Sequence, residues 1–336
     1  MTIILSRSDV QRCLSMSEMI ARMEIAFRAF HRGNVQMPER VRLALPNGSG
    51  YAAFMPGCVP EIEGLGIKVN TNFKKNPERF GLPSILGLII LLDTKSGVPK
   101  AIMDSTLITA FRTGAVSGLA TKYLAREDVR RLGVLGSGAQ SIPQIQAVAE
   151  VRGIEKVSVY SPNLASKKDA FLAQLRPVVS ADVEIGASAE SVVRQADVLV
   201  LCSNSSTPIL QGEWVQDGTC ILAIGNASPN TREVDGMTVA RSRVVCDSFR
   251  ACLMEAGDLL IPLREGLIAK EHFQLDLAEI IENPERRRRG ERDITLFKSV
   301  GLGFQDIVAA AHVYSKALAG SAPLRDFHFF EDSGSP

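Results

Sequence analysis

The chain has 336 residues, more than one compact core usually holds, so we expect two domains. Its 38 basic and 37 acidic residues leave a net charge of +1, which produces no field that would attract nucleic acid. No basic segment followed by a long apolar core begins the chain, and the run at 82–92 is too short to span a bilayer. The six cysteines lack CxxC spacing, which indicates reduced thiols rather than a zinc site. We therefore expect a cytoplasmic protein with no membrane, nucleic-acid or metal partner.

A helix is predicted over residues 15–32, where apolar side chains recur at helical spacing and Gly33 follows. Ser15 and Glu18 have the spacing of a capping box at its start. The broad apolar stripe predicts a packing face, either in a core or in a dimer interface.

From residue 41 to residue 100 the pattern changes to short apolar or alternating runs, which predict a mostly β region. These runs are VRLALP, YAAFMPG, GLGIKV and ILGLIILL. The last of them lies within residues 82–92, which we interpret as a buried strand. A helix is predicted to follow near residues 105–125.

After Asp128 strands and helices alternate, which is typical of a doubly wound parallel sheet. The strand-like runs are LGVLG, VSVYS, DVLVLCS, TCILAIG and RVVCDS. The charged run PERRRRGERD at 284–293 is predicted to be a solvated loop. The fold class is therefore α/β.

The sequence GSGAQS at 136–141 joins the strand-like run at 132–135 to a helical segment. Gly136 permits a tight turn, and Gly138 lets the backbone approach a pyrophosphate at the amino terminus of the helix. We assign Gly136, Gly138, Ala139 and Gln140 to cofactor binding. Ser141 stands where this motif has its third glycine, so a tight turn without a ligand is the alternative.

The strand at 156–160 should end near the adenosine ribose of a bound dinucleotide. Ser161, Asn163 and Lys167 follow it, with Lys168 beside them and no carboxylate to repel a 2′-phosphate. NADP is therefore slightly favoured over NAD, although both lysines could be ordinary helix-surface residues. Ser203 follows the run DVLVLC and is predicted, together with Ser205 and Thr207, to contact the ribose or the nicotinamide.

Four segments resemble the ornithine cyclodeaminase/mu-crystallin family, and the likeness extends over residues 3–317. They are GLGIKVN at 64–70, the segment at 97–126, GVLGSGAQS at 133–141 and DITLFKSVGLGFQDIVAA at 293–310. The resemblance implies a Rossmann domain, here residues 125–299, inserted into a mostly β domain for substrate binding and dimerisation. That second domain would comprise residues 1–124 and 300–330, and the protein would be a homodimer.

The resemblance also implies site residues. Arg40, with Arg42 as a competitor, and Arg112 look like the arginines that bind a substrate carboxylate, because a guanidinium can donate two parallel hydrogen bonds. Lys68 looks like the lysine that faces the substrate, and a neighbourhood of two arginines should lower its pKa. Asp306 would orient Lys68, while Thr113 and Ser117 would lie near the nicotinamide and phosphates. The alternatives are surface charges for Arg40 and Arg42, an internal ion pair for Arg112, and a helix-capping acid or ion-pair partner for Asp306.

One position departs from the cyclodeaminases of the family, which carry an aspartate two residues before the proline that is Pro229 here. This chain has Ala227 there, and a methyl group cannot act as a base. We therefore predict an NAD(P)-dependent oxidoreductase, an imine reductase or amino-acid dehydrogenase acting on a small α-amino or cyclic imino acid. The alternatives are an ornithine or lysine cyclodeaminase that releases ammonia, and a catalytically weak NADPH-dependent binding protein.

Overall fold

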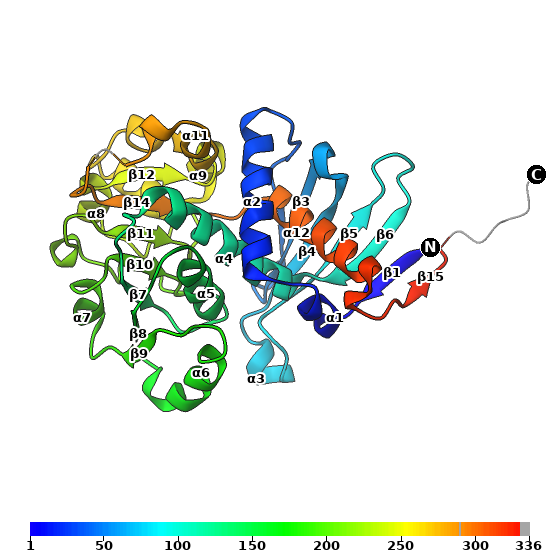
Figure 1. Ribbon diagram of the computed structural model, residues 1–336, viewed down its shortest axis with the longest axis horizontal. Coiled ribbons are helices and arrows are strands. Elements are labelled where there is room, and N and C mark those ends of the chain that lie inside the picture. Colours follow the sequence, from blue (N-terminus) through cyan, green and yellow to red (C-terminus); the bar gives the residue numbers. More distant parts are fainter. Residues whose placement is uncertain (289, 330–336) are drawn as a thin grey trace, which may run out of the picture. The chain divides into compact units, whose positions relative to one another are not determined.

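The computed structural model describes residues 1–288 and 290–329, which form two compact units (Figure 1). The first unit contains Met1–Arg112 and the chain from Leu302 onward, and the second contains Thr113–Gly301. The first boundary lies inside the helix α4 (Ser105–Leu124), whereas the sequence places it at the end of that helix. Within the described residues, no helix has both the length and the apolar character needed to cross a bilayer.

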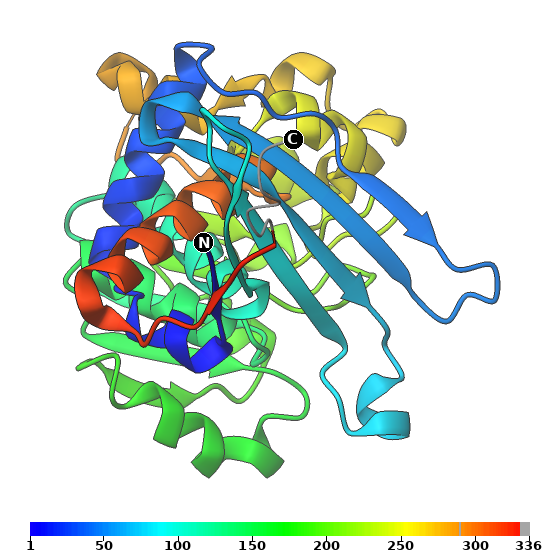
Figure 2. The same ribbon diagram turned by 90° about the vertical axis from the view of Figure 1, so that its right-hand side faces the viewer.

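In its described part, the first unit builds one mostly antiparallel sheet of seven strands. Their order is β15-β1-β6-β5-β4-β3-β2, and only β1 and β6 pair in parallel. The strands are β1 (Thr2–Leu5), β2 (Val41–Ala44), β3 (Tyr51–Val59), β4 (Gly64–Asn72), β5 (Ile85–Leu92), β6 (Pro99–Asp104) and β15 (Asp326–Phe327). The helices are α1 (Arg7–Arg12), α2 (Met16–His31), α3 (Asn76–Phe80), the first part of α4, and α12 (Gly303–Lys316). Figure 2 shows β3, β4 and β5 as long neighbouring strands, with α3 at the far end of the hairpin that joins β4 to β5.

Helix α12 packs on β3, β4 and β5, and α2 packs on α12. Two glycines permit the close approach of α12 to β3. A Cβ at Gly57 would lie 3.0 Å from the backbone nitrogen of Phe304, and one at Gly303 would lie 2.5 Å from the carbonyl oxygen of Pro56. This contact fixes the first turn of α12 over the sheet, and the site described below depends on it.

Two expectations for this unit were wrong in detail. The side chain of Ser15 makes no capping hydrogen bond, and its hydroxyl lies 3.1 Å from that of Ser17. The Glu18 carboxylate does not complete a capping box either, since it lies 2.5 Å from Lys316 Nζ and 3.3 Å from His312 Nε2 on α12. The run at 82–92 does contain β5, but the first half of that strand is not buried, since Leu88 is 52% exposed. Burial was predicted there because the run is apolar. The sequence alone does not distinguish side chains buried inside one chain from side chains on a surface that another chain could cover.

The described part of the second unit forms a sheet of eight strands, all parallel. Their order is β13-β12-β14-β11-β10-β7-β8-β9. The strands are β7 (Arg131–Leu135), β8 (Lys156–Tyr160), β9 (Asp182–Ile185), β10 (Val198–Leu201), β11 (Cys220–Ala223), β12 (Arg243–Cys246), β13 (Leu275–Asp276) and β14 (Thr295–Lys298). The helices are α5 (Ser141–Val151), α6 (Lys168–Leu175), α7 (Ala189–Val193), α8 (Gly236–Arg241), α9 (Phe249–Glu255), α10 (Gly257–Arg264) and α11 (Leu277–Glu282).

Helices α7 and α8 lie on one side of this sheet, and α5 and the second part of α4 lie on the other (Figure 1). Strands β10 and β11 are buried throughout because both faces of the sheet are covered, which explains their continuous apolar runs. The chain order reverses on the two sides of β7, so the sheet has the topological switch point of a Rossmann fold. The predicted α/β class is confirmed.

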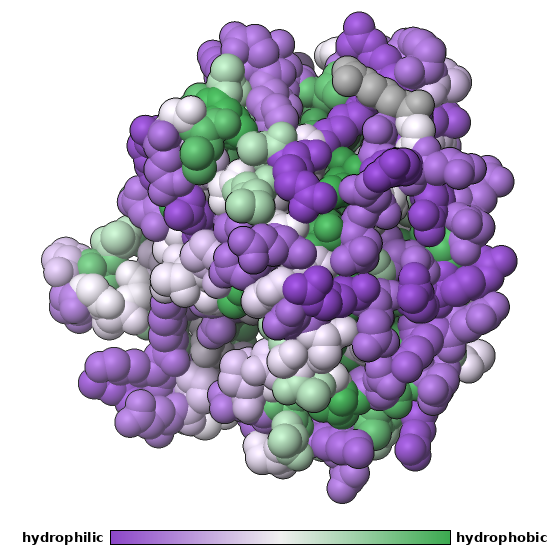
Figure 3. Space-filling model, turned by 90° about the vertical axis from the view of Figure 1, so that its left-hand side faces the viewer, coloured by the Kyte–Doolittle hydropathy of each residue, from purple (hydrophilic) through white to green (hydrophobic). Residues whose placement is uncertain are grey.

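The arginine-rich run at 284–293 is exposed over most of its described residues, as predicted from its charge, but Arg287 and Arg288 are half-buried. Arg288 donates hydrogen bonds to four backbone carbonyls, and the Arg287 guanidinium lies 4.5 Å from the ring centroid of Tyr123. A guanidinium has five donors in a fixed plane, so one side chain can bind the carbonyl ends of several segments. The acceptors belong to Leu124, Gly218, Glu291 and Asp293. Elsewhere hydrophilic side chains predominate on the face of this unit seen in Figure 3, with hydrophobic ones in small scattered groups.

Candidate active site

Three predicted residues of the first unit come together in one buried cluster. Lys68 Nζ lies 2.6 Å from Asp306 Oδ2, and Arg112 Nε donates to Asp306 Oδ1 at 2.9 Å. Asp306 is fully buried, while Lys68 and Arg112 are 3% and 5% exposed. The same carboxylate therefore holds an ammonium and a guanidinium side by side. Both the orienting role and the ion-pair alternative considered for Asp306 describe this geometry.

Strand alternation explains why Lys68 points at α12. Residues 64, 66 and 68 share one face of β4, and the first two are glycines that lie against Ile307 of α12. Lys68 is thus the first large side chain on this face, and it meets Asp306 one turn into the helix. Its Nζ also lies 3.5 Å from Thr109 Oγ1 on α4.

The guanidinium of Arg112 is oriented by two acceptors. Besides Asp306, Gln305 Oε1 accepts from Arg112 Nη1 at 2.7 Å. Among the described residues, Nη2 of Arg112 has no acceptor. A ligand carboxylate is the natural acceptor for such a charged donor.

The electrostatics of the cluster favour proton transfer near neutrality. Burial lowers the pKa of Lys68 to about 8; Asp306 opposes this effect, while Arg112 and Arg40 reinforce it. The lowered pKa of Lys68 was predicted from the two arginines and the cationic ring of a bound cofactor, but burial is the largest cause. Burial would raise the pKa of Asp306, yet Arg112 and Lys68 hold it below the ordinary value.

The structure separates Arg40 from its competitor Arg42. The charge of Arg40 acts on Lys68, whereas the Arg42 guanidinium lies 5.6 Å from the ring centroid of Tyr51. Arg40 is therefore the residue of the two that adds positive charge to the cluster.

The glycine turn of the second unit follows β7 as predicted. Gly136 has a φ of +124°, its nitrogen donates to Tyr160 at 2.9 Å, and a Cβ there would lie 2.8 Å from the carbonyl of Cys202. Only glycine suits that position. A Cβ at Gly138 would meet nothing within 4 Å, so the backbone there faces open space. Ser141, in place of the third glycine, donates through Oγ to the Gly138 carbonyl at 2.7 Å and begins α5.

These features fit the pyrophosphate of a dinucleotide, because an open glycine backbone precedes the amino terminus of an eleven-residue helix. Ala139 and Gln140 complete the turn. Ser161 is half-buried after β8, and Asn163 and Lys167 are exposed, so all three can be reached by a ligand at that strand end. Thr113 and Ser117 lie buried within α4, and the hydroxyl of Ser117 has no hydrogen-bond partner among the described residues.

A buried polar network at the carboxyl ends of β10, β11 and β14 was missed from the sequence. Ser203 Oγ donates to Glu233 Oε1 at 2.6 Å, and the backbone nitrogen of Glu233 donates to Asp258 Oδ1 at 2.6 Å. Lys298 Nζ donates to Asp258 Oδ2 at 2.7 Å. Lys298 at the end of an apolar strand was a signal of such a network, whereas nothing around Glu233 distinguished it from a surface acid. Burial, with help from Asp258, raises the pKa of Glu233 to about 7.

Ser205 and Thr207 were predicted beside Ser203. They bond to each other, because Ser205 Oγ donates to the carbonyl of Thr207 at 2.7 Å. They therefore shape the loop after β10.

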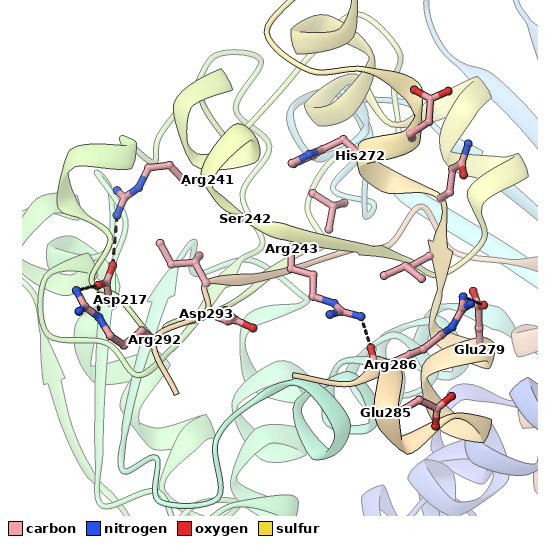
Figure 4. A pocket seen from close by; sticks show the side chains of 15 residues that line it. Asp217, Arg241, Ser242, Arg243, His272, Glu279, Glu285, Arg286, Arg292 and Asp293 are labelled. Atoms are coloured by element: carbon pink, nitrogen blue, oxygen red, sulfur yellow. Dashed lines mark hydrogen bonds and ion pairs between the residues drawn. The ribbon is translucent and has the colours of Figure 1, made fainter. Parts of the chain in front are cut away.

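A cavity of about 1040 Å³ lies by the amino ends of β12, β13 and β14 in the sheet of the second unit (Figure 4). The glycine turn and Ser203 lie at the carboxyl ends of the strands. Five of its charged side chains pair with one another: Arg241 and Arg292 with Asp217, and Arg286 with Glu279. The cavity is remote from the glycine turn along the strands, so it is not the dinucleotide site.

Comparison with known proteins decides the family. The model of the ornithine cyclodeaminase/mu-crystallin family matches residues 1–321. The chain belongs to that family. The predicted resemblance is therefore confirmed over nearly the whole length.

Relatives in the family are named as reductases and dehydrogenases. The chain is 34% identical to a Delta(1)-pyrroline-2-carboxylate reductase of Bacillus cereus over 317 residues, 94% of this chain and 97% of that one. A structure of Thermococcus litoralis Delta(1)-pyrroline-2-carboxylate reductase with NADH and L-proline is 38% identical, has a TM-score of 0.92, and aligns with 97% of this chain and all of the other. An archaeal alanine dehydrogenase dimer with bound NAD is 31% identical, has a TM-score of 0.89, and covers 97% and 99% of the two chains.

Proposed function

We propose that the protein is an NAD(P)-dependent reductase of small cyclic α-imino acids, with pyrroline-2-carboxylate as the first substrate to test. The observation that carries this proposal is the cluster in which Asp306 holds Lys68 and Arg112 together. The cluster offers a carboxylate-binding cation and a proton-exchanging amine, the two groups that an α-imino acid requires. The named activities of the relatives support the same reaction class.

In this proposal the substrate carboxylate accepts hydrogen bonds from Nη2 of Arg112 and an ionic contact from Arg40. Lys68 donates its proton, or a hydrogen bond, to the imine nitrogen, which makes the neighbouring carbon more electrophilic. Asp306 does not touch the substrate in this scheme. It keeps Lys68 and Arg112 in position and keeps part of the Lys68 population protonated.

The dinucleotide, when bound, supplies the hydride. Gly136, Gly138, Ala139 and Gln140 would hold its pyrophosphate, while Thr113 and Ser203 would lie by the nicotinamide half. Ser161, Asn163 and Lys167 would contact the adenosine ribose. We favour NADP over NAD because the segment after β8 carries Lys167 and Lys168 and no acid before Asp169.

The test follows the consumption of NADPH and NADH with pyrroline-2-carboxylate, with piperideine-2-carboxylate, and with pyruvate plus ammonia. We expect turnover with the cyclic imino acids and its loss in Lys68→Ala, with dinucleotide binding retained. Absence of turnover with every imino acid from mild acid to mild base would contradict the proposal.

A second candidate is reductive amination of pyruvate, which the likeness to alanine dehydrogenase favours. Faster turnover with pyruvate plus ammonia than with either cyclic substrate would select it. Cyclodeamination of ornithine is disfavoured by Ala227, since no carboxylate stands at that position. Ammonia release from ornithine with catalytic NAD would reverse that judgement.

We further propose that the protein acts as a homodimer in the cytoplasm. Exposed apolar side chains concentrate on β2, α3 and β5 of the first unit and in the segments beside them, a larger group than isolated surface residues normally make. They are Val41, Leu43, Leu45, Phe80, Leu82, Ile85, Leu86 and Leu88. The archaeal relative described as a dimer supports this assembly.

A further inference from the structure

The carboxylate of Glu233 is buried directly behind the loop that follows β10. Its Oε1 accepts from the backbone nitrogen of Ser203 at 2.8 Å and from the hydroxyl of Ser203 at 2.6 Å. Its Oε2 has no partner among the described residues and packs against the next loop, since a Cβ at Gly225 would lie 2.3 Å from it. Glu233 is fully buried, so it acts on a ligand only through the groups that it holds.

The hydrogen bonds of Ser203 define what its hydroxyl can recognise. The proton of Oγ is committed to Glu233, and one lone pair accepts from the backbone nitrogen of Ser205 at 3.1 Å. One acceptor position remains, and no donor does. Ser203 is half-buried, so this position is open to a ligand. The matching ligand group is therefore an N–H or O–H.

The place of Ser203 in the sheet indicates which part of a dinucleotide carries the N–H or O–H that donates to Ser203. A Cβ at Gly136 would lie 3.0 Å from the backbone nitrogen of Ser203, so the β10 loop adjoins the glycine turn. At a switch point the two halves of a dinucleotide extend to opposite sides of that turn. The adenosine half would lie over β8, and the other half would lie over β10.

We propose that Glu233 is a positioning residue that fixes the Ser203 hydroxyl as a hydrogen-bond acceptor for the nicotinamide half of the cofactor. This inference rests on the proposed function only in taking a nicotinamide dinucleotide as the ligand. The donor is either a hydroxyl of the nicotinamide ribose or the amide of the nicotinamide. The anchor behind Glu233 is Asp258, which accepts from the backbone nitrogens of Glu233 and Val234 and pairs with Lys298.

The test measures dissociation constants of the whole protein for NADH or NADPH, ADP-ribose and ADP. ADP lacks the entire nicotinamide nucleoside, and ADP-ribose keeps a ribose in its place. We expect Glu233→Ala to bind the reduced dinucleotide about tenfold more weakly, the effect of one lost hydrogen bond, and to bind ADP with unchanged affinity. The affinity for ADP-ribose shows which donor is involved. Glu233→Ala should bind ADP-ribose more weakly if the donor is the ribose, and as tightly as the wild type if the donor is the amide.

Three further variants separate positioning from a merely structural role. Glu233→Gln keeps an acceptor for Ser203 and should bind within about threefold of the wild type. Ser203→Ala should show the same selective loss as Glu233→Ala, and the double variant should be no weaker than either single one. Asp197→Asn removes another buried carboxylate of this unit, one that accepts from Arg130 and Arg131 at the amino edge of the sheet. It should lower stability without changing the ratio of the three affinities.

Any of three results would overturn the inference. The first is an equal loss of affinity for ADP and for the reduced dinucleotide in Glu233→Ala, and the second is additive losses in the double variant. The third is normal dinucleotide binding in Ser203→Ala. The last result decides even if Glu233→Ala fails to fold. Turnover of pyrroline-2-carboxylate by the wild type is measured in parallel. A wild type that binds the dinucleotide but reduces no imino acid refutes the proposed function and leaves the inference standing.

Discussion

Lys68 has a lowered pKa of about 8, which gives the proposed reaction a defined pH dependence. In the proposed reaction, reduction of the imine requires the protonated amine of Lys68. The kcat/KM for reduction should therefore fall about tenfold per pH unit above about pH 8. Oxidation of proline requires the neutral amine of Lys68, so kcat/KM for oxidation should rise through the same pH range. Steady-state rates in both directions check this. A reductive profile that stays flat to about pH 10 would contradict the role of Lys68 as the acid.

Asp306→Asn tests the carboxylate that holds the cluster. Two cations would remain buried without their counter-ion, which typically costs about 3–5 kcal/mol of the free energy of unfolding. Because Asp306 raises the pKa of Lys68, its loss should also move the break in the reductive pH profile to lower pH. Urea unfolding and the profile measure the two effects. In the exposed control Glu61→Gln, which loses one surface pair with Arg32, the change should be below about 1 kcal/mol.

Residue identity predicted some of this site and not the rest. Lys68 stood out because a lysine inside an apolar strand is unusual, and Gly136 because a turn there needs a positive φ. Glu233 had no such signal: its burial depends on loops after β10 and β11 that meet only in the folded sheet. The partner of Glu18 was equally hidden, since Lys316 lies on α12, far away in sequence.

At the scale of elements, the end of α4 depends on one side chain. Arg152 follows α5, is half-buried, and donates to carbonyls at the carboxyl terminus of α4. The acceptors are Thr121, Lys122, Ala125 and Arg126. Such bonds help to satisfy carbonyls in the last turn of a helix, where most lack a helical N–H; the Thr121 carbonyl also accepts from the backbone nitrogen of Ala125.

Arg152→Ala should therefore lower the free energy of unfolding by about 2–3 kcal/mol, the value for hydrogen bonds from a charged donor. Chemical denaturation measures the loss. The control is Arg194→Ala, which removes an exposed pair with Glu190 and should cost less than about 1 kcal/mol. A similar loss in both variants would show that Arg152 is an ordinary surface residue.

The elements found from sequence were those with strong local patterns. Every strand-like run named after Asp128 became a strand, because a parallel sheet covered on both faces needs continuous apolar segments. Three strands were not found: β9 and the two-residue β13, which have no continuous apolar run, and the buried β14, whose sequence TLFK is short and ends in a lysine. Within the arginine run, the half-burial of Arg288 was not foreseen because its acceptors include the carbonyls of Leu124 and Gly218, which distant segments supply.

At the scale of the whole molecule, the exposed apolar side chains of the first unit predict self-association. Leu43→Lys combined with Leu88→Lys should convert a dimer to a monomer, because charges would be buried in the interface. Light scattering measures the mass. The matched control, Leu267→Lys, changes a leucine of the second unit that is 55% exposed and should leave the dimer intact. A monomeric wild type would contradict the proposal.

The central claim, that a nicotinamide hydride reaches the imine carbon of a cyclic imino acid at the Lys68–Arg112–Asp306 cluster, is tested most directly by isotope transfer. Pyrroline-2-carboxylate is reduced with a dinucleotide that carries deuterium at both C4 positions, and the product is examined by mass spectrometry and NMR. We expect proline with deuterium at Cα, formed by the wild type and not by Lys68→Ala. Proline without that deuterium, or equal formation by the variant, would contradict it.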